Sequence, residues 1–328
     1  MSGSRAAAFD ARRGEAWTRR QRLKNDLIYG AIRAALAVVS VTPRALVRLG
    51  CRFLGLVAWV ALPRERRLAR ERLEAGLGAP VSSRRVRGVF RGAADTLADT
   101  LFLLDPREPA DRTLRIEPGS GEVFRAALDE GRGVVFLCAH LGPWERLAAL
   151  FAAEGFPCAT VARESYDPRL TRLYEELRAP RGVRAIYRGQ PGAATAIVRE
   201  LRKGRAVGFL ADLPSRVPSL PTRLFGAVAD LPVGPARIAL ARGAAVLVGT
   251  CIPGGLVRVT RLTSSDLAPG AEGERELLDR MAAALDERIA LGPEAWLGLF
   301  APPKVSGAPG PIEFATPGGL PIDSEGSS

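Results

Sequence analysis

The strongest constraint on this fold is a regular alternation of short apolar runs with amphipathic segments, beginning near residue 85. The clearest run, 134–138, is typical of a buried strand after a Gly turn. Alternation of this kind predicts an α/β fold with a mixed sheet flanked by helices. We expect strands at 134–138, 158–163, 183–187, 206–211, 220–225, 244–252 and 256–262, and helices at 143–153, 168–178, 193–202, 234–242 and 272–290.

Composition excludes several classes of protein. The 328 residues include four scattered cysteines and one histidine, His140, and 47% of the chain is apolar. A disulfide scaffold, a zinc ribbon and any site that needs two imidazoles are therefore excluded, and the apolar content argues against disorder. No metal or prosthetic group is implied.

Positive charge is concentrated at the N-terminus. Residues 1–72 carry sixteen basic and five acidic side chains, whereas residues 73–328 are nearly neutral, with 31 basic and 30 acidic. This contrast predicts a basic, apolar helical region at 1–75 and a nearly neutral globular domain at 76–304. The Gly-, Pro- and Ser-rich tail at 305–328 is expected to be disordered.

Two N-terminal helices separated by Pro43 are expected between Leu27 and Leu62. Their uncharged stretches, 34–43 and 53–63, are shorter than the roughly 20 residues of a simple membrane span. Arg44, Arg48 and Arg52 form a basic stripe beside a wide apolar face, a pattern typical of a helix lying in a membrane interface. The alternative is an amphipathic helix packed on the body with solvated arginines. Nucleic-acid binding is disfavoured because no aromatic series accompanies the charge.

His140 is the candidate base. It follows the strongest strand, and Glu145 lies five residues later, in the expected first turn of a helix whose first residue we expect to be Pro143. The bend between strand and helix can bring the two side chains together, so that Glu145 orients the imidazole. No serine nucleophile is then required if the substrate itself supplies the hydroxyl. A satisfied structural histidine is the alternative.

The His140–Glu145 segment resembles the H-x4-D/E motif of the glycerolipid-type acyltransferases. The residues between His140 and Glu145 also resemble the corresponding segment of the bacterial lipid A late acyltransferases (lauroyl/myristoyl transferases). Further blocks resembling that family follow in the same order and extend the likeness over about residues 25–303. These blocks are at 163–170, 203–212, 224–226, 231–239 and 293–297, with an additional arginine at Arg178.

The resemblance implies transfer of a fatty acyl chain from acyl carrier protein or acyl-CoA to a hydroxyl of a lipid A precursor, at the cytoplasmic face of the cell inner membrane. His140 and Glu145 would be catalytic. Arg163 and Arg178 are candidates for phosphate or oxyanion contact, and Asp212 for orienting one of them; a structural ion pair or a strand-end cap is the alternative in each case. The implied partners are the acyl donor, a phosphorylated glycolipid and the membrane surface.

Three positions depart from the family pattern: Pro143 replaces Asn, Leu213 replaces Gln, and Glu164 replaces the Pro after Arg163. They leave two alternatives open. One is an acyltransferase acting on a phosphatidylinositol mannoside or other glycolipid, although those relatives usually carry Asp where this chain has Glu145. The other is a catalytically inactive lipid-binding relative.

Overall fold

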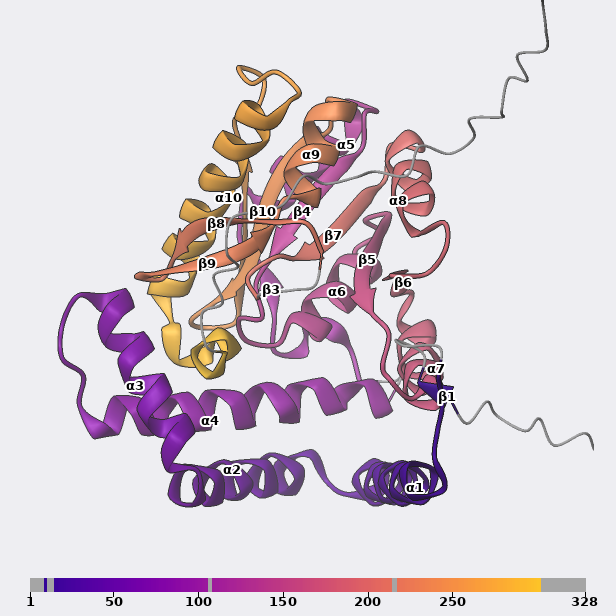
Figure 1. The fold of residues 1–328 in the computed structure, drawn as a ribbon, viewed down its shortest axis with the longest axis vertical. Helices are drawn as coiled ribbons and strands as arrows, with labels where there is room; N and C mark the ends of the chain where they lie inside the picture. The colour runs from indigo at the N-terminus through magenta and orange to yellow at the C-terminus, as the bar shows by residue number, and fades with distance from the viewer. Residues whose placement is uncertain (1–8, 11–14, 106–107, 214–216, 302–328) are drawn as a thin grey trace, which may run out of the picture.

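The computed structural model describes residues 9–10, 15–105, 108–213 and 217–301 (Figure 1). Its centre is a seven-stranded sheet in the order β3-β11-β10-β4-β7-β5-β6, in which only the β10–β11 pair is antiparallel. The predicted mixed α/β sheet is thus confirmed. The strands are β3 (Arg115–Ile116), β4 (Val134–Cys138), β5 (Cys158–Arg163), β6 (Arg184–Arg188), β7 (Ala206–Leu210), β10 (Ala245–Ile252) and β11 (Leu256–Leu262).

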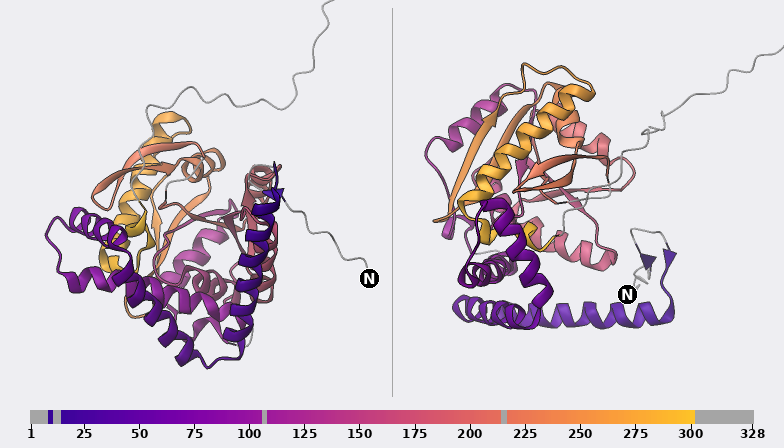
Figure 2. Two further views of the ribbon diagram at one scale, coloured as in Figure 1. Left: turned by 60° about the horizontal axis from the view of Figure 1, so that its bottom comes forward. Right: turned by 60° about the vertical axis from the view of Figure 1, so that its left-hand side comes forward.

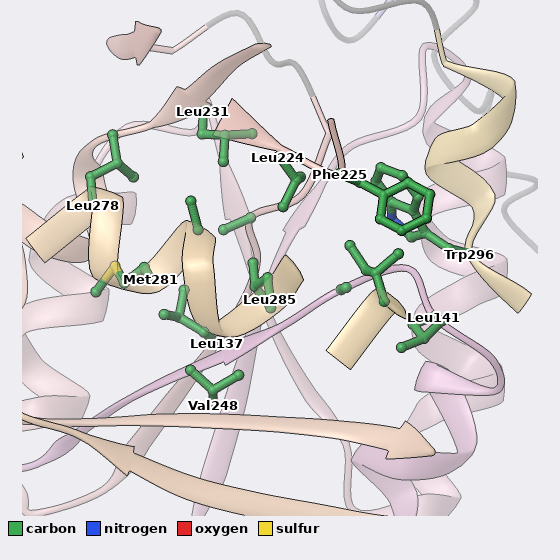
Figure 3. Packing of buried hydrophobic residues seen from close by; sticks show 14 of the residues in the cluster. Leu137, Leu141, Leu224, Phe225, Leu231, Val248, Leu278, Met281, Leu285 and Trp296 are labelled. Atoms are coloured by element: carbon green, nitrogen blue, oxygen red, sulfur yellow. The ribbon is translucent and has the colours of Figure 1, made fainter. Parts of the chain in front are cut away.

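Helices cover both faces of the sheet because strand side chains alternate in direction. In β4, Val135 and Leu137 join one buried cluster, whereas Val134, Phe136 and Cys138 join another. The first cluster includes side chains of α8 (Ala193–Arg202), α9 (Gly234–Arg242) and α10 (Ala271–Leu291), and Figure 3 shows part of it. The second includes α5 (Ser120–Asp129) and α6 (Trp144–Ala153).

The remaining elements surround this core. The antiparallel pair β8 (Ser219–Leu224) and β9 (Ala227–Pro232) lies outside the main sheet and packs on α10. The sequence patterns predicted β8 as extended and missed β9. The other elements are β1 (Phe9–Asp10), β2 (Glu15–Ala16), α7 (Pro168–Arg178) and the short 3-10 helices Leu101–Leu104, Ala110–Arg112, Ala179–Arg181, Pro293–Ala295 and Leu297–Phe300.

Four helices precede the sheet: α1 (Arg19–Val41), α2 (Arg44–Ala61), α3 (Pro63–Leu77) and α4 (Ser83–Thr100). The predicted break at Pro43 is confirmed. Figure 2 shows α1 and α2 running along the side of the molecule away from the sheet. No single described helix is both long and apolar enough to cross a membrane. The pair α2 and α3, bent by 93°, reaches the required length and composition only together.

The basic stripe of α2 faces the protein. Arg48 and Arg52 pair with Asp99 and Asp95 of α4, each at 2.7 Å, and Arg44 pairs with Glu108 at 2.9 Å. This corrects the expectation that the arginines are directed toward lipid headgroups or solvent. The partners lie some 40 to 65 residues further along the chain, so the spacing within α2 could not reveal them.

With its arginines turned inward, α2 presents apolar side chains to solvent. Of the seventeen large apolar residues that are exposed in the described chain, twelve belong to α1 and α2. We call these twelve the outer apolar face. Its members are Leu23, Leu27, Ile28, Val38, Val41, Leu46, Leu49, Phe53, Leu54, Leu56, Val57 and Val60.

Helix α3 packs against the domain that contains the seven-stranded sheet. Ala69 and Leu73 have no exposed surface and belong to the same buried cluster as β4. The domain division at residue 75 stays a prediction. The tail predicted to be disordered, 305–328, lies outside the described residues.

Candidate active site

His140 and Asp212 meet at the carboxyl edge of the sheet because their strands are neighbours. Strands β4 and β7 run parallel, with Cys138 opposite Leu210. His140 and Asp212 each lie two residues beyond these positions, so the register places them side by side. Sites in α/β sheets gather at this edge.

Asp212 holds His140 through two hydrogen bonds. The backbone N–H of His140 donates to one carboxylate oxygen at 2.9 Å, and Nδ1 lies 2.8 Å from the other. The Asp212 side chain is completely buried. Burial raises the pKa of this carboxyl, but the charge and hydrogen bonds of His140 outweigh that effect, and the pKa ends below its usual range. The ionised carboxylate fixes the proton on Nδ1 and leaves Nε2 as the basic nitrogen.

Glu145, which was expected to orient His140, has a different partner. It lies in the first turn of α6, where Pro143 is the N-cap and not the first helical residue as predicted. Both of its carboxylate oxygens accept from Arg178 of α7, with Nε at 2.9 Å. Asp212, and not Glu145, occupies the position that orients the imidazole. Asp212 is 72 positions from His140 in the chain, but the parallel register of β4 and β7 places it beside Nδ1, and the bend between β4 and α6 does not bring Glu145 as close. A catalytic role for Glu145 stays a prediction.

Asp212 was expected to orient one of the two arginines, or to act as a strand-end cap. In the structure its carboxylate accepts from His140 and from Trp296 and not from an arginine among the described residues, and a contact of Asp212 with substrate stays a prediction. A sequence signal for this role did exist, since His140 and Asp212 both lie two residues beyond an apolar strand.

Trp296 completes the support of the pair, and sequence reasoning assigned it no role. Its indole N–H donates to Asp212 Oδ2 at 2.7 Å, and its ring is almost completely buried against Phe225. The segment around it also braces the loop after β4: Leu297 N–H donates to the His140 carbonyl at 2.9 Å, and Gly142 N–H to the Ala295 carbonyl at 3.0 Å. Leu141, Phe225 and Trp296 lie together in Figure 3.

The segment around Trp296 can support the loop after β4 only because it approaches α4 closely. A Cβ on Gly92 would lie 2.2 Å from the carbonyl oxygen of Glu294, far inside van der Waals contact. Any larger residue at position 92 would therefore push this segment away from the helix, and with it the indole that holds Asp212.

His140 lies on the wall of a cavity of about 630 Å³, a size typical of small-molecule sites. One part of the wall is apolar and buried, with Phe124, Phe136, Leu147 and Phe151. Polar residues, several of them arginines, line another part. Such a cavity suits a ligand with a long apolar portion and a charged portion.

The cavity also contains cysteines, but these are poor nucleophiles. Burial raises the pKa of the Cys158 thiol to about 11, and it raises that of Cys138 further. Neither forms appreciable thiolate near neutral pH. Among the described residues, no group of three or more His, Cys, Asp or Glu side chains is placed to hold a metal ion.

The predicted arginines line the cavity with His140. Arg178 forms an ion pair with Glu145. The two side chains are nearly buried, with 14% and 10% of their surface exposed. Burial lowers the pKa of Arg178, but the hydrogen bonds that Arg178 donates to Glu145 and the charge of that carboxylate outweigh this effect, so the net shift of the pKa is upward. Arg163 ends β5 and is exposed. Contact of either with phosphate or an oxyanion stays a prediction.

The site thus consists of a histidine that a buried carboxylate holds at the sheet edge, beside an apolar cavity. An α/β protein with such a site belongs to the class that can take a proton from a hydroxyl of an apolar ligand. The particular family follows from comparison with known proteins. A model of the bacterial lipid A biosynthesis acyltransferase family matches residues 19–301. The chain belongs to this family, as its motifs predicted.

A curated relative is similar over part of the chain. It is a phosphatidylinositol mannoside acyltransferase of Mycolicibacterium smegmatis, 27% identical over 128 residues. The similar stretch covers 38% of this chain and 42% of the relative, so the match spans less than half the length of that protein.

Proposed function

We propose that the protein is a membrane-associated O-acyltransferase that moves a fatty acyl chain from a thioester to a hydroxyl of a glycolipid. The observation that carries the proposal is the His140–Asp212 pair on the wall of an apolar cavity. Family membership supports acyl transfer, and the apolar wall suits a fatty chain.

In the proposed reaction, Nε2 of His140 accepts the proton of the acceptor hydroxyl as its oxygen attacks the thioester carbonyl. Asp212 stabilises the imidazolium that forms. The tetrahedral oxyanion then collapses, the carbon–sulfur bond breaks, and His140 returns the proton to the departing thiolate. The products are an ester and a free thiol, of acyl carrier protein or of CoA.

For the acceptor, we propose a lipid A precursor, in line with the family description and with Glu145 at the motif carboxylate. The partial similarity to a phosphatidylinositol mannoside acyltransferase favours a second candidate, a mannoside glycolipid. Both are phosphorylated glycolipids, and the catalytic steps are the same for each.

Mass spectrometry of intact lipids, from cells with and without the gene, distinguishes these acceptors. Loss of one acyl chain from lipid A, restored by the wild type and not by His140→Ala, is the expected result. The same loss from another glycolipid would move the acceptor and keep the mechanism. Restoration by His140→Ala would contradict the proposed reaction.

We further propose that the outer apolar face rests in the cytoplasmic surface of the inner membrane. The arginines of α2 are paired with carboxylates of the body, so its contact with lipid would be apolar. Leu49 and Phe53 are both 64% exposed on this face. Their transfer into the acyl boundary would contribute about 1.5 to 3 kcal/mol each.

The double substitution Leu49→Asp/Phe53→Asp is expected to lower binding to anionic vesicles by about 100-fold or more. Sedimentation with vesicles of phosphatidylcholine and phosphatidylglycerol measures this. Val228→Asp, at an exposed apolar residue of β9, is the matched control and should bind like the wild type. Equal binding by all three proteins would contradict the orientation.

A further inference from the structure

The polar part of the cavity wall holds two arginines that the fold places side by side. Arg163 and Arg188 are the last residues of β5 and β6, and they are direct partners in the parallel register. Both line the cavity that contains His140. Two cations thus stand next to each other at the same sheet edge as the candidate base.

Arg188 has no compensating charge among the residues that the structure describes. It is half-buried, and among the described residues no carboxylate forms an ion pair with it. Burial and then the neighbouring charge of Arg163 lower the pKa of Arg188. Glu164, next along the chain, accepts a hydrogen bond from Gln190. A half-buried cation held beside a second cation costs free energy that a bound anion would offset.

The two arginines also stand at a useful distance from the base. The strand order is β4-β7-β5-β6, and adjacent strands lie about 4.8 Å apart. An anion between Arg163 and Arg188 would therefore lie roughly 10 to 15 Å from His140. An anionic group of a bound substrate could occupy this position while a different part of that substrate reached the imidazole.

We propose that Arg163 and Arg188 together form a phosphate subsite for a substrate of the acyl transfer, with Arg188 the residue that pairs with the phosphate most directly. The inference rests on the proposed function. The phosphate could belong to the donor, as in a phosphopantetheine thioester, or to the glycolipid acceptor. Guanidinium groups favour phosphate because their N–H donors match its oxygens.

Binding of inorganic pyrophosphate to the full chain, measured by calorimetry, tests the subsite without requiring activity. Arg188→Gln is expected to weaken this binding about tenfold or more. Arg184→Gln is the matched control, since it removes the same charge from the other end of β6, where Arg184 pairs with Glu200. Equal pyrophosphate binding by the wild type and both variants would overturn the proposal.

Kinetics then identify the source of the phosphate. If it belongs to the donor, Arg188→Gln should raise KM about tenfold for an acyl-phosphopantetheine and leave KM for the corresponding acyl-pantetheine unchanged. If it belongs to the acceptor, KM should rise for the phosphorylated glycolipid and not for its dephosphorylated form. KM values unchanged for every substrate would overturn the proposal. Absence of transfer by the wild type would instead refute the proposed function, and pyrophosphate binding would still decide the subsite.

Discussion

Asp212→Asn is expected to lower kcat for acyl transfer by about 10³- to 10⁴-fold while the protein stays folded. The carboxylate accepts from His140 Nδ1 at 2.8 Å, from the His140 backbone at 2.9 Å and from Trp296 at 2.7 Å. An amide cannot stabilise the imidazolium and can hold the ring in the wrong tautomer. Steady-state kinetics with a saturating acyl donor measure the loss.

Two further variants provide an intermediate case and a control for Asp212→Asn. Trp296→Phe removes the hydrogen bond to Asp212 but keeps an aromatic ring at this buried position, and it should lower kcat by about tenfold. Asp266→Asn removes a surface carboxylate that pairs with Arg280 and should leave kcat unchanged. Retention of a tenth or more of wild-type activity by Asp212→Asn would mean that Asp212 does not position the base.

The stability that Asp212 provides also has a defined pH dependence. Its pKa in the folded protein is lowered, so the unfolded state binds the proton more readily. The contribution is therefore present above the unfolded pKa of about 3.9 and is lost as pH falls through the lower folded value. The stability difference between the wild type and Asp212→Asn should shrink as the solution is acidified below about pH 4.

Glu145→Gln is expected to destabilise the protein by about 3 kcal/mol or more, because it leaves the charge of Arg178 nearly buried and unpaired. Removal of both charges in Glu145→Gln/Arg178→Gln should recover much of that loss. Urea unfolding measures both effects. Glu276→Gln, in a more exposed pair with Arg280, is the control and should change stability by less than about 1 kcal/mol.

The same variants separate a positioning role of Glu145 from a catalytic one. If Glu145 acts only by holding α6 to α7, the double variant should regain activity together with stability. If Glu145 or Arg178 touches the reacting groups, the double variant should be stable and inactive, and the single variant Arg178→Gln then shows which of the two is required. A change below about 0.5 kcal/mol for Glu145→Gln would contradict the account of the buried pair.

Features that depend on neighbouring residues could be predicted from the sequence, whereas contacts between distant segments could not. Apolar periodicity located β4, β5 and β10, and Pro43 located the break between α1 and α2, because these features depend on neighbouring residues. His140 was found for the same reason, as a histidine directly after a strong strand.

The partner of His140 could not be found in this way. Its identity depends on β7 lying beside β4, although β5 and β6 come between them in the chain. Local spacing favoured Glu145, five residues away, over Asp212. Likewise, the stripe on α2 indicated an amphipathic helix correctly but not its orientation, which is set by acidic residues of α4 and by Glu108.

We propose above that His140, held by Asp212, takes the proton of a glycolipid hydroxyl during acyl transfer. The most direct test incubates purified wild type and His140→Ala with an acyl thioester and a phosphorylated glycolipid, and follows the ester product by mass spectrometry. We predict a glycolipid one acyl chain heavier, together with free thiol, with the wild type only. The same ester from His140→Ala at a comparable rate would contradict the account.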